Sequence, residues 1–371
     1  MASVDHDRSD ISLDPIPATR GLLNSWTDSG EVLGAYVFVS HHGRLVADVA
    51  IGRCSPERSS RTSDVGRLYC GVKPFVAVCL AKAVQDGMME FGAPVREFVD
   101  VPDTGQWKSV DILSLLAHSS GLRPSHDNPY LRSFDSYVAT IGRDDERPAR
   151  WVGQPVYNTT DAWHLLAASV ERVFRRPIDA VVEEVVAQPV GADSLCLLHP
   201  VVEDYAPLHA RGPSATFREV SDAPRRELFS RVNPAHGGFS RNGDVGRFYS
   251  ELLDCHAGRG VLLEARVVRE MTRPHAILNE GSRQQHVWGL GFEMAVAPRY
   301  FGVGWGRRSF GHSGAVGYVT QGPPRVFLVS LADPESGLVL SLRLASIDAR
   351  SGFRLASIGR SLTTDLADYL A

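Results

Sequence analysis

A cysteine and a lysine are the residues of this sequence whose types and spacing best suit covalent chemistry. Cys70 precedes Lys73 by three residues in the run YCGVKP, and the apolar residues that follow recur at helical spacing. Side chains three residues apart on a helix share one face, so the thiol and the amine can touch. A helix N-terminus and a nearby ammonium both favour the thiolate, the nucleophilic form of cysteine. Cys70 is therefore a candidate nucleophile with Lys73 within its reach.

The same spacing also fits a purely structural interpretation. Cysteine is among the most buried residue types and behaves as a small apolar side chain, while Lys73 would be a solvated lysine at the start of a helix. The sequence also leaves open whether Cys70 is the natural nucleophile or a replacement for a serine. The segments around the pair have to decide between these interpretations.

Four further segments follow the YCGVKP run in a fixed order. They read DGMMEFGAPVREFV, SVDILSLLAHSSGL, NPAHGGFSRNGDVGRFYSELL, and finally WGLGF followed by GHSGAVG. Together they resemble, over roughly residues 30–320, the family of class C β-lactamases, related esterases, penicillin-binding proteins and transacylases. That family has S-x-x-K-P where this chain has C-x-x-K-P. The order of several segments is far more specific than one motif.

The resemblance implies roles for individual residues. Cys70 matches the family's nucleophile and Lys73 matches the residue that accepts its proton. Tyr157, in the run YNT, matches the tyrosine of the Y-x-N element, which could shuttle the proton to the leaving group. The match departs from the pattern at the third position, where Thr159 stands instead of asparagine. An ordinary core tyrosine is the alternative interpretation for Tyr157.

A late strand is implied to form the other side of the site. His312, Ser313 and Gly314 match the family's K-T-G or H-x-G strand, and the backbone N–H of Ala315 could form an oxyanion hole with that of Cys70. For His312 the structural alternative is a histidine at a strand edge that has found its hydrogen-bond partners. The neighbouring glycines favour a pocket-lining role.

Other histidines and tryptophans are assigned structural roles. His118 in AHSSGL and His236 in NPAHGG lie in segments that shape loops, and neither has partners at the spacing of metal ligands, so no metal and no cofactor are expected. Four tryptophans could line a pocket, although core packing is their commoner role; these are Trp151, Trp163, Trp288 and Trp305.

The elements that must position these residues form an α+β fold. Strands are predicted around the turn at His42 and Gly43, a helix from Lys73 to Gly87, several helices over 110–190, and strands again from WGLGFEMAV to Ala345 before a last helix. The resemblance implies a β-lactamase/transpeptidase-like antiparallel sheet flanked by helices with a helical inserted region. We expect a flexible arm over 1–17 and one domain over 18–371. Its α/β part takes 18–75 and about 285–371, and its mostly helical part about 76–284.

Composition excludes several classes of partner. The chain has 371 residues, 43% of them hydrophobic, and a formal net charge of −4, so no basic excess is present to bind nucleic acid. No apolar run is long enough to span a membrane, and MASVDHDRSDISLDPIP lacks the basic start and apolar run of a secretory signal. The five cysteines form no C-x-x-C pair, which fits a reducing compartment. These features predict a cytoplasmic protein.

The resulting functional hypothesis is an acyl-transfer enzyme that works through an acyl-Cys70 intermediate. We expect a transacylase that forms an ester or amide on a small metabolite, from a small-molecule donor, an acyl carrier protein or a coenzyme A thioester. A hydrolase of the esterase or amidase type and an inactive binding homologue are the alternatives, because fold does not choose among them. The acyl donor, the acceptor and the oligomeric state cannot be predicted from these residues.

Overall fold

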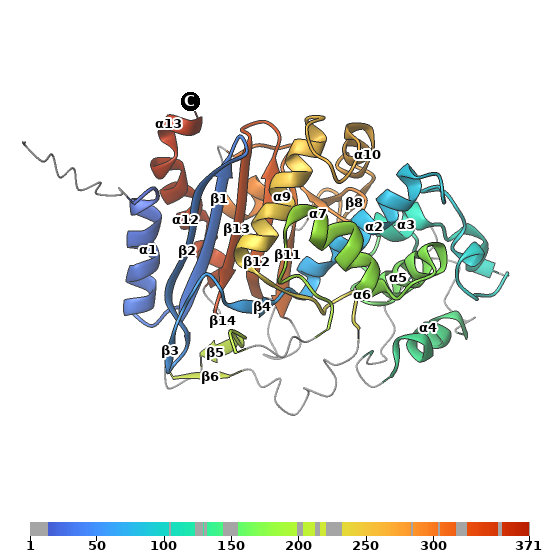
Figure 1. The fold of residues 1–371 in the computed structure, drawn as a ribbon, viewed down its shortest axis with the longest axis horizontal. Coiled ribbons are helices and arrows are strands. Elements are labelled where there is room, and N and C mark those ends of the chain that lie inside the picture. Colours follow the sequence, from blue (N-terminus) through green and yellow to red (C-terminus); the bar gives the residue numbers. More distant parts are fainter. Residues whose placement is uncertain are drawn as a thin grey trace, which may run out of the picture.

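A nine-stranded antiparallel sheet forms the centre of the computed structural model (Figure 1). The structure describes residues 14–103, 105–122, 129, 132–143, 155–198, 203–211, 216–219, 232–282, 285–302, 305–316, 325–347 and 351–370. The strand order is β3-β2-β1-β13-β12-β11-β10-β9-β8. The strands of this sheet are β1 (Gly34–His41), β2 (Arg44–Ser55), β3 (Arg58–Ser59), β8 (Ala276–Leu278), β9 (His286–Trp288), β10 (Glu293–Met294), β11 (Phe310–Val316), β12 (Arg325–Asp333) and β13 (Leu338–Leu344). The predicted α+β class with an antiparallel sheet is confirmed.

The two ends of the chain share this sheet. β1 pairs with β13 in a register that sets Ala35 opposite Leu344. The predicted hairpin is also present, with β1 and β2 joined by His42 and Gly43, whose φ angles of 47° and 76° are both positive. Positive φ at both central residues is the geometry whose twist suits a two-residue hairpin.

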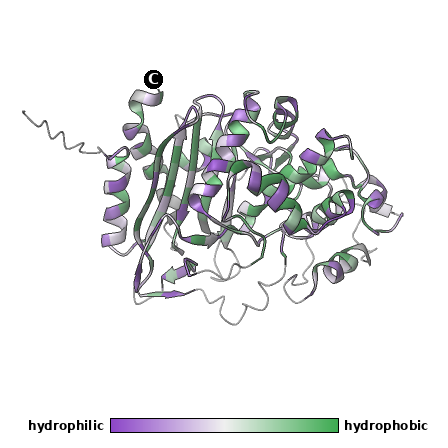
Figure 2. Ribbon diagram, in the orientation of Figure 1, coloured by the Kyte–Doolittle hydropathy of each residue, from purple (hydrophilic) through white to green (hydrophobic). Residues whose placement is uncertain are grey.

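Helices cover both faces of the sheet. In Figure 1, α1 (Pro17–Asp28) and α12 (Ser351–Asp365) lie on one face, whereas α9 (Asn242–His256) lies on the other, beside the helical region. The strands are largely hydrophobic and the outer helix surfaces are largely hydrophilic (Figure 2), as expected for layers that bury one side. The remaining helical elements are η1 (Tyr69–Val72), α2 (Lys73–Gln85), η2 (Val95–Glu97), η3 (Gly105–Ser109), α3 (Ile112–Leu116), α4 (Phe134–Arg143), α5 (Asp161–Phe174), α6 (Ile178–Val182), η6 (Glu183–Ala187), α7 (Gln188–Val190), α10 (Ala265–Met271), α11 (Val296–Phe301) and α13 (Ala367–Leu370).

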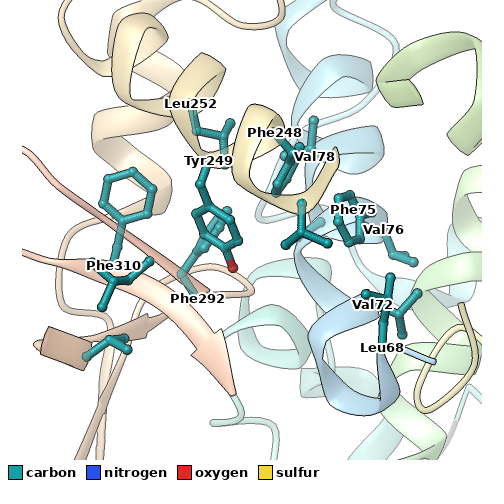
Figure 3. Close-up of a cluster of buried hydrophobic side chains, with 14 of the residues drawn as sticks. Leu68, Val72, Phe75, Val76, Val78, Phe248, Tyr249, Leu252, Phe292 and Phe310 are labelled. Atoms are coloured by element: carbon teal, nitrogen blue, oxygen red, sulfur yellow. The ribbon is translucent and has the colours of Figure 1, made fainter. Parts of the chain in front are cut away.

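Helix α2 runs through the hydrophobic core. Ten of its thirteen residues are buried, because it is apolar on nearly every side and must be covered all round. Figure 3 shows Phe75 of α2 near Phe248 of α9, and the centres of these two rings lie 4.3 Å apart. This packing fixes the start of α2, where Lys73 lies.

Three short segments differ from the predicted elements. The strand predicted through Val296 ends at Met294, since Ala295 takes a positive φ of 54° and α11 begins after it. The helix predicted near residues 179–190 contains a π-helical turn, η6. In the predicted N-terminal arm, residues 1–13 lie outside the described residues, and Ile16 is fully buried just before α1.

Two small sheets lie beside the large one. β14 (Ser346–Ile347) pairs with β5 (His209–Arg211), which pairs with β6 (Phe217–Glu219), and β4 (Val65–Arg67) pairs with β7 (Phe239–Arg241). In the described part of the chain, no helix combines the length and apolar character that a membrane span requires.

Candidate active site

Cys70 lies in a 3₁₀ turn rather than in the α-helix predicted for it. The turn η1 ends at Val72, and α2 begins at Lys73. Tyr69, the residue before the cysteine, has a positive φ of 50°, a conformation that costs about 1–3 kcal/mol and persists only where the surroundings enforce it. The thiol of Cys70 is partly exposed. The nucleophile candidate is therefore presented on a tight, strained turn that leads into a buried helix.

Two glycines allow this turn to lie against the sheet. A Cβ atom on Gly71 would stand 2.7 Å from Cδ2 of Leu328 on β12, and one on Gly314 would stand 2.7 Å from the carbonyl oxygen of Leu68. Both distances are too short for any side chain. The glycine after Cys70 and the glycine of β11 thus bring the turn and the strand together.

Lys73 is fully buried beside Cys70. Its Nζ donates a hydrogen bond to the carbonyl oxygen of Ala235 at 2.6 Å and lies 5.7 Å from the ring centres of both Tyr157 and Trp163. Burial lowers the pKa of the ammonium group, and the nearby sulfur of Cys70 opposes this shift. A lysine with a lowered pKa can accept a proton near neutral pH.

Tyr157 lies against the same sulfur. Burial raises the pKa of its hydroxyl well above the usual value, and the charge and hydrogen bonding of Cys70 raise it further. At neutral pH the side chain is a phenol, which can donate a proton but has none of the basicity of a phenolate. The structure therefore brings together the three residues predicted for catalysis, Cys70, Lys73 and Tyr157.

The residues after Tyr157 hold the start of α5. Asn158 donates from Nδ2 to the carbonyl oxygen of Leu122 at 2.9 Å, and its Oδ1 accepts from the backbone N–H of Thr160 and of Ala162, both at 3.1 Å. This is helix capping, in which a side-chain oxygen satisfies free backbone N–H groups. In this chain the asparagine of the segment is therefore Asn158, at the second position of Y-x-N, and its side chain stabilises the start of α5.

His312 lies on β11 as a neutral, buried imidazole. Its Nδ1 lies 2.7 Å from the carbonyl oxygen of Ser313, which can only accept, so the ring proton is on Nδ1 and Nε2 is left as an acceptor. Burial lowers the pKa of His312 to about 3, and the charge of Lys73 contributes to the shift. The histidine is therefore close enough to Lys73 for their charges to interact.

The other residues of the predicted strand have separate surroundings. Ser313 Oγ accepts a hydrogen bond from Tyr300 Oη at 3.0 Å, and Tyr300 also reaches Glu293 Oε2 at 3.3 Å. The register of β11 against β12 shifts between Gly314 and Ala315. Such a bulge redirects the backbone next to a site, and it falls at the residue proposed for the oxyanion hole.

An aromatic cluster beside Tyr157 was not assigned to the site from sequence. The Trp288 ring stacks on the Tyr157 ring with centres 5.2 Å apart, and His118 lies 4.6 Å from each of these rings. Trp288 also lies 5.5 Å from His312. His118 and Trp288 each stand within segments that carry the family resemblance, which is the signal that could have placed them here.

The other predicted tryptophans and histidines pack in the protein interior or near it. Trp163 and Trp305 are buried, and Trp151 lies outside the described residues. His236 is held through its backbone, since its carbonyl oxygen accepts from Arg67 Nε at 3.0 Å. Within the described ranges, no group of three or more His, Cys, Asp or Glu side chains could hold a metal ion.

Comparison with known proteins shows the family of the chain. A family model described as Beta-lactamase matches residues 20–339. The chain belongs to the Beta-lactamase family. A curated relative, the esterase EstB of Burkholderia gladioli, is 29% identical over 180 residues. That match takes in 43% of this chain and 46% of the relative, so the chain spans about half the length of the curated relative it matches.

Solved structures share the fold of this chain at low sequence identity. A penicillin-binding protein homologue from Caulobacter crescentus superimposes with a TM-score of 0.75 at 20% identity, covering 95% of this chain and 98% of that one. EstCE1, described as a hydrolase with promiscuous acyltransferase activity, gives a TM-score of 0.74 at 16% identity, covering 94% and 98%. These similarities confirm the predicted β-lactamase/transpeptidase-like fold.

Proposed function

We propose that this Beta-lactamase family member is an acyl-transfer enzyme that acts on esters or thioesters through a thioester to Cys70. The convergence of Cys70, Lys73 and Tyr157 carries the proposal, because it supplies a nucleophile, a base and an acid within one contact shell. Similarity to the esterase EstB supports an ester as the substrate class.

The first step forms the acyl-enzyme. Lys73 accepts the thiol proton of Cys70, and the sulfur attacks the carbonyl carbon of the donor. A C–S bond forms, the bond from that carbon to the leaving oxygen or sulfur breaks, and Tyr157 gives its proton to the leaving group. Lys73 then returns a proton to Tyr157, so both side chains end as they began. The N–H groups of Cys70 and Ala315 are the proposed donors to the oxyanion.

The second step releases the acyl group. An acceptor hydroxyl or amine gives its proton to Lys73 and attacks the carbonyl carbon of the thioester. The C–S bond breaks, and the Lys73 ammonium returns the proton to the Cys70 sulfur, which restores the thiol and the neutral amine. We propose transfer to an alcohol or amine on a small metabolite as the main outcome, because a thiol nucleophile suits exchange between activated acyl groups. An acyl carrier protein or a coenzyme A thioester would be a suitable donor.

Hydrolysis is the second candidate function. It differs only in the acceptor, which is water. The match to an esterase supports it, as does the structural similarity to EstCE1, a hydrolase with promiscuous acyltransferase activity. A binding protein without turnover is the third alternative, and only reactivity separates it from the other two.

Intact-mass measurement after incubation with an activated aryl ester tests the proposal. We expect a mass increase of one acyl group on the wild-type protein and none on Cys70→Ala. Discharge of the adduct that speeds up with added amine or alcohol supports transfer, whereas discharge at one rate regardless of acceptor supports hydrolysis. A wild-type protein without adduct would overturn the enzymatic proposal.

The Cys70→Ser variant is the matched control for the nucleophile. If the thiol is the natural choice, Cys70→Ser should be slower than wild type with thioester donors while it keeps the same melting temperature. A faster Cys70→Ser variant would contradict a thiol-based mechanism and indicate that the site is built for a hydroxyl nucleophile.

A further inference from the structure

His118 has an unusual backbone conformation at the edge of the candidate site. It follows α3, is 1% exposed, and has a positive φ of 56°. Residues other than glycine are uncommon in this region, although histidine and asparagine enter it more often than most. A buried residue held in this conformation indicates that its neighbours constrain it from several sides.

The constraint on His118 comes from the segment that carries Tyr157. The carbonyl oxygen of His118 accepts a hydrogen bond from the backbone N–H of Val156 at 2.8 Å. Its ring Nδ1 accepts from the backbone N–H of Asn158 at 3.3 Å. His118 therefore holds the backbone N–H groups of the residues before and after Tyr157, and its ring lies 4.6 Å from the ring of Tyr157.

These contacts fix the protonation state that His118 must have. A backbone N–H can only donate, so Nδ1 of His118 has to be unprotonated and the ring proton has to be on Nε2. Burial lowers the pKa of His118 well below its usual value, helped by the charges of Lys73 and His312. The imidazole is therefore neutral, and its Nδ1 remains free to accept the hydrogen bond from Asn158.

Trp288 also packs against the ring of Tyr157, beside His118. The ring of Trp288 stacks on that of Tyr157 at an interplanar angle of 22°, and His118 meets Trp288 nearly at right angles. Because its backbone is hydrogen-bonded to His118 and its ring contacts both His118 and Trp288 in a three-ring cluster, Tyr157 has little freedom to rotate away from Cys70. Proton transfer needs such placement, because it requires contact within hydrogen-bond distance.

We infer that His118 is a positioning residue that fixes the hydroxyl of Tyr157 over Cys70 and Lys73 by accepting a hydrogen bond at Nδ1 and holding a left-handed backbone. The inference rests on the proposed function, in which Tyr157 transfers the proton of the leaving group. If the inference is right, replacing His118 changes the rate of acylation, whereas a histidine that only packs in the core would affect stability alone.

Three variants separate the hydrogen bond from the packing of the ring. His118→Gly tolerates the left-handed backbone but removes the acceptor. His118→Asn also tolerates that backbone, and its Oδ1 stands where Nδ1 stood, so it restores the acceptor without the ring. His164→Asn is the control, since His164 is a buried histidine on α5 with a lowered pKa whose ring contacts that of Tyr137, at 4.6 Å between centres, rather than that of Tyr157.

The rate constant for acylation of Cys70 by an activated aryl ester should fall about 10- to 100-fold in His118→Gly, because a displacement of about 1 Å has effects of this size. In His118→Asn it should recover to within about threefold of wild type. His164→Asn should acylate at the wild-type rate even if its melting temperature falls. A wild-type rate in His118→Gly, or an equal loss in His118→Gly and His118→Asn, would overturn the inference.

A second measurement does not depend on turnover. In protein labelled with ¹³C at the tyrosine Cζ, the Tyr157 signal, assigned with Tyr157→Phe, should move in His118→Gly and return toward its wild-type position in His118→Asn. If the wild-type protein forms no acyl adduct, the proposed function fails while this signal still reports whether His118 positions Tyr157. An unmoved Tyr157 signal in His118→Gly would contradict the positioning role by itself.

Discussion

Among the residues that the structure describes, two buried side chains are a lysine and an arginine, and the difference between their surroundings separates a structural charge from a reactive one. Arg343, on β13, is 4% exposed, and Lys73, at the start of α2, is fully buried. Burying a charge is costly unless it is paired and hydrogen-bonded. The two sites meet that cost in different ways.

Arg343 has a complete set of partners. Its guanidinium donates from Nη1 to the carbonyl oxygen of Ser240 and from Nη2 to that of Asp64, both at 2.9 Å, and lies 4.3 Å from the centre of the Tyr36 ring. The Asp64 carboxylate supplies a counter-charge and accepts a hydrogen bond from Tyr36 Oη at 2.6 Å. Arginine does not deprotonate in proteins, so this charge is permanent.

Lys73 has a neutral carbonyl and a thiol where Arg343 has a carboxylate. The Ala235 carbonyl oxygen accepts its hydrogen bond, and the group that favours its charged form is the sulfur of Cys70. Because a thiol and an amine can exchange one proton, the charge of Lys73 depends on the state of Cys70. The comparison indicates that a buried cation balanced by a carboxylate stabilises the fold, whereas one balanced by a nucleophile can take part in chemistry.

The Lys73→Met variant should show the largest effect. Methionine has a similar length and no charge, so acylation of Cys70 should fall by about 10³-fold, within the range for loss of a general base. The free energy of unfolding should stay within about 1 kcal/mol of wild type, because the lost hydrogen bond is offset by removal of a desolvated charge. Rates of labelling by an activated ester and chemical denaturation measure the two quantities.

Lys82→Met is the control for that experiment. Lys82 lies on the same helix, α2, but is partly exposed and pairs with Asp86. The Lys82→Met variant should be acylated at Cys70 at the wild-type rate. Labelling at the wild-type rate in Lys73→Met would remove the lysine from the proposed mechanism.

The Arg343→Met variant should give the next largest effect, on stability rather than on rate. It leaves the buried backbone carbonyl groups of Ser240 and Asp64 without their donors, while the Asp64 carboxylate keeps its ion pair with Arg58, so the free energy of unfolding should fall by about 2–4 kcal/mol. Urea denaturation measures the loss, and Arg266→Met, which breaks an exposed ion pair with Glu264, should change little. If Arg343→Met is as stable as wild type or more stable, the buried charge of Arg343 does not stabilise the fold, and the proposed difference between the two cations is wrong.

The smallest effect is expected in acid. His312 has a pKa of about 3 in the folded protein and about 6.5 when unfolded, so the unfolded state binds the proton first as the pH falls. Stability is therefore unaffected above pH 6.5 and is lost progressively below it, by about 2 kcal/mol for this group at pH 5. Replacing the histidine in His312→Gln should make the fall from pH 6.5 to 5 shallower, as measured by urea denaturation at each pH.

Measuring stability against pH in variants of Lys73 and Arg343 also distinguishes the two buried cations. The charge of Lys73 contributes to the low pKa of His312, so the acid loss of stability in Lys73→Met should be shallower than in wild type. Arg343 is not among the groups that act on His312, and a more conservative Arg343→Lys variant should keep the wild-type slope. Equal slopes in wild type and Lys73→Met would mean that Lys73 is neutral at these pH values.

The sequence predicted the fold and the members of the site better than their local geometry. Alternation around His42 and Gly43 and the helical spacing after Lys73 are local patterns, so the hairpin and α2 could be predicted from them. The placement of Cys70 in a 3₁₀ turn could not, because it depends on Gly71 packing against β12. The role of His118 depends on its left-handed backbone, and that of the Ala235 carbonyl depends on a contact with Lys73, which is distant in sequence. Neither feature can be predicted from composition or periodicity.

The shared sheet of the chain's two ends has a consequence for how the protein is made. Ala35 finds its partner Leu344 only after the whole helical region has left the ribosome, and pairings between residues so distant in sequence are slow to form. Until then α2, apolar on almost every side, has no finished sheet to cover it, and the thiol of Cys70 is next to it. We therefore expect nascent chains of this protein to expose an apolar segment and an oxidisable thiol for most of their synthesis, which makes them prone to aggregation.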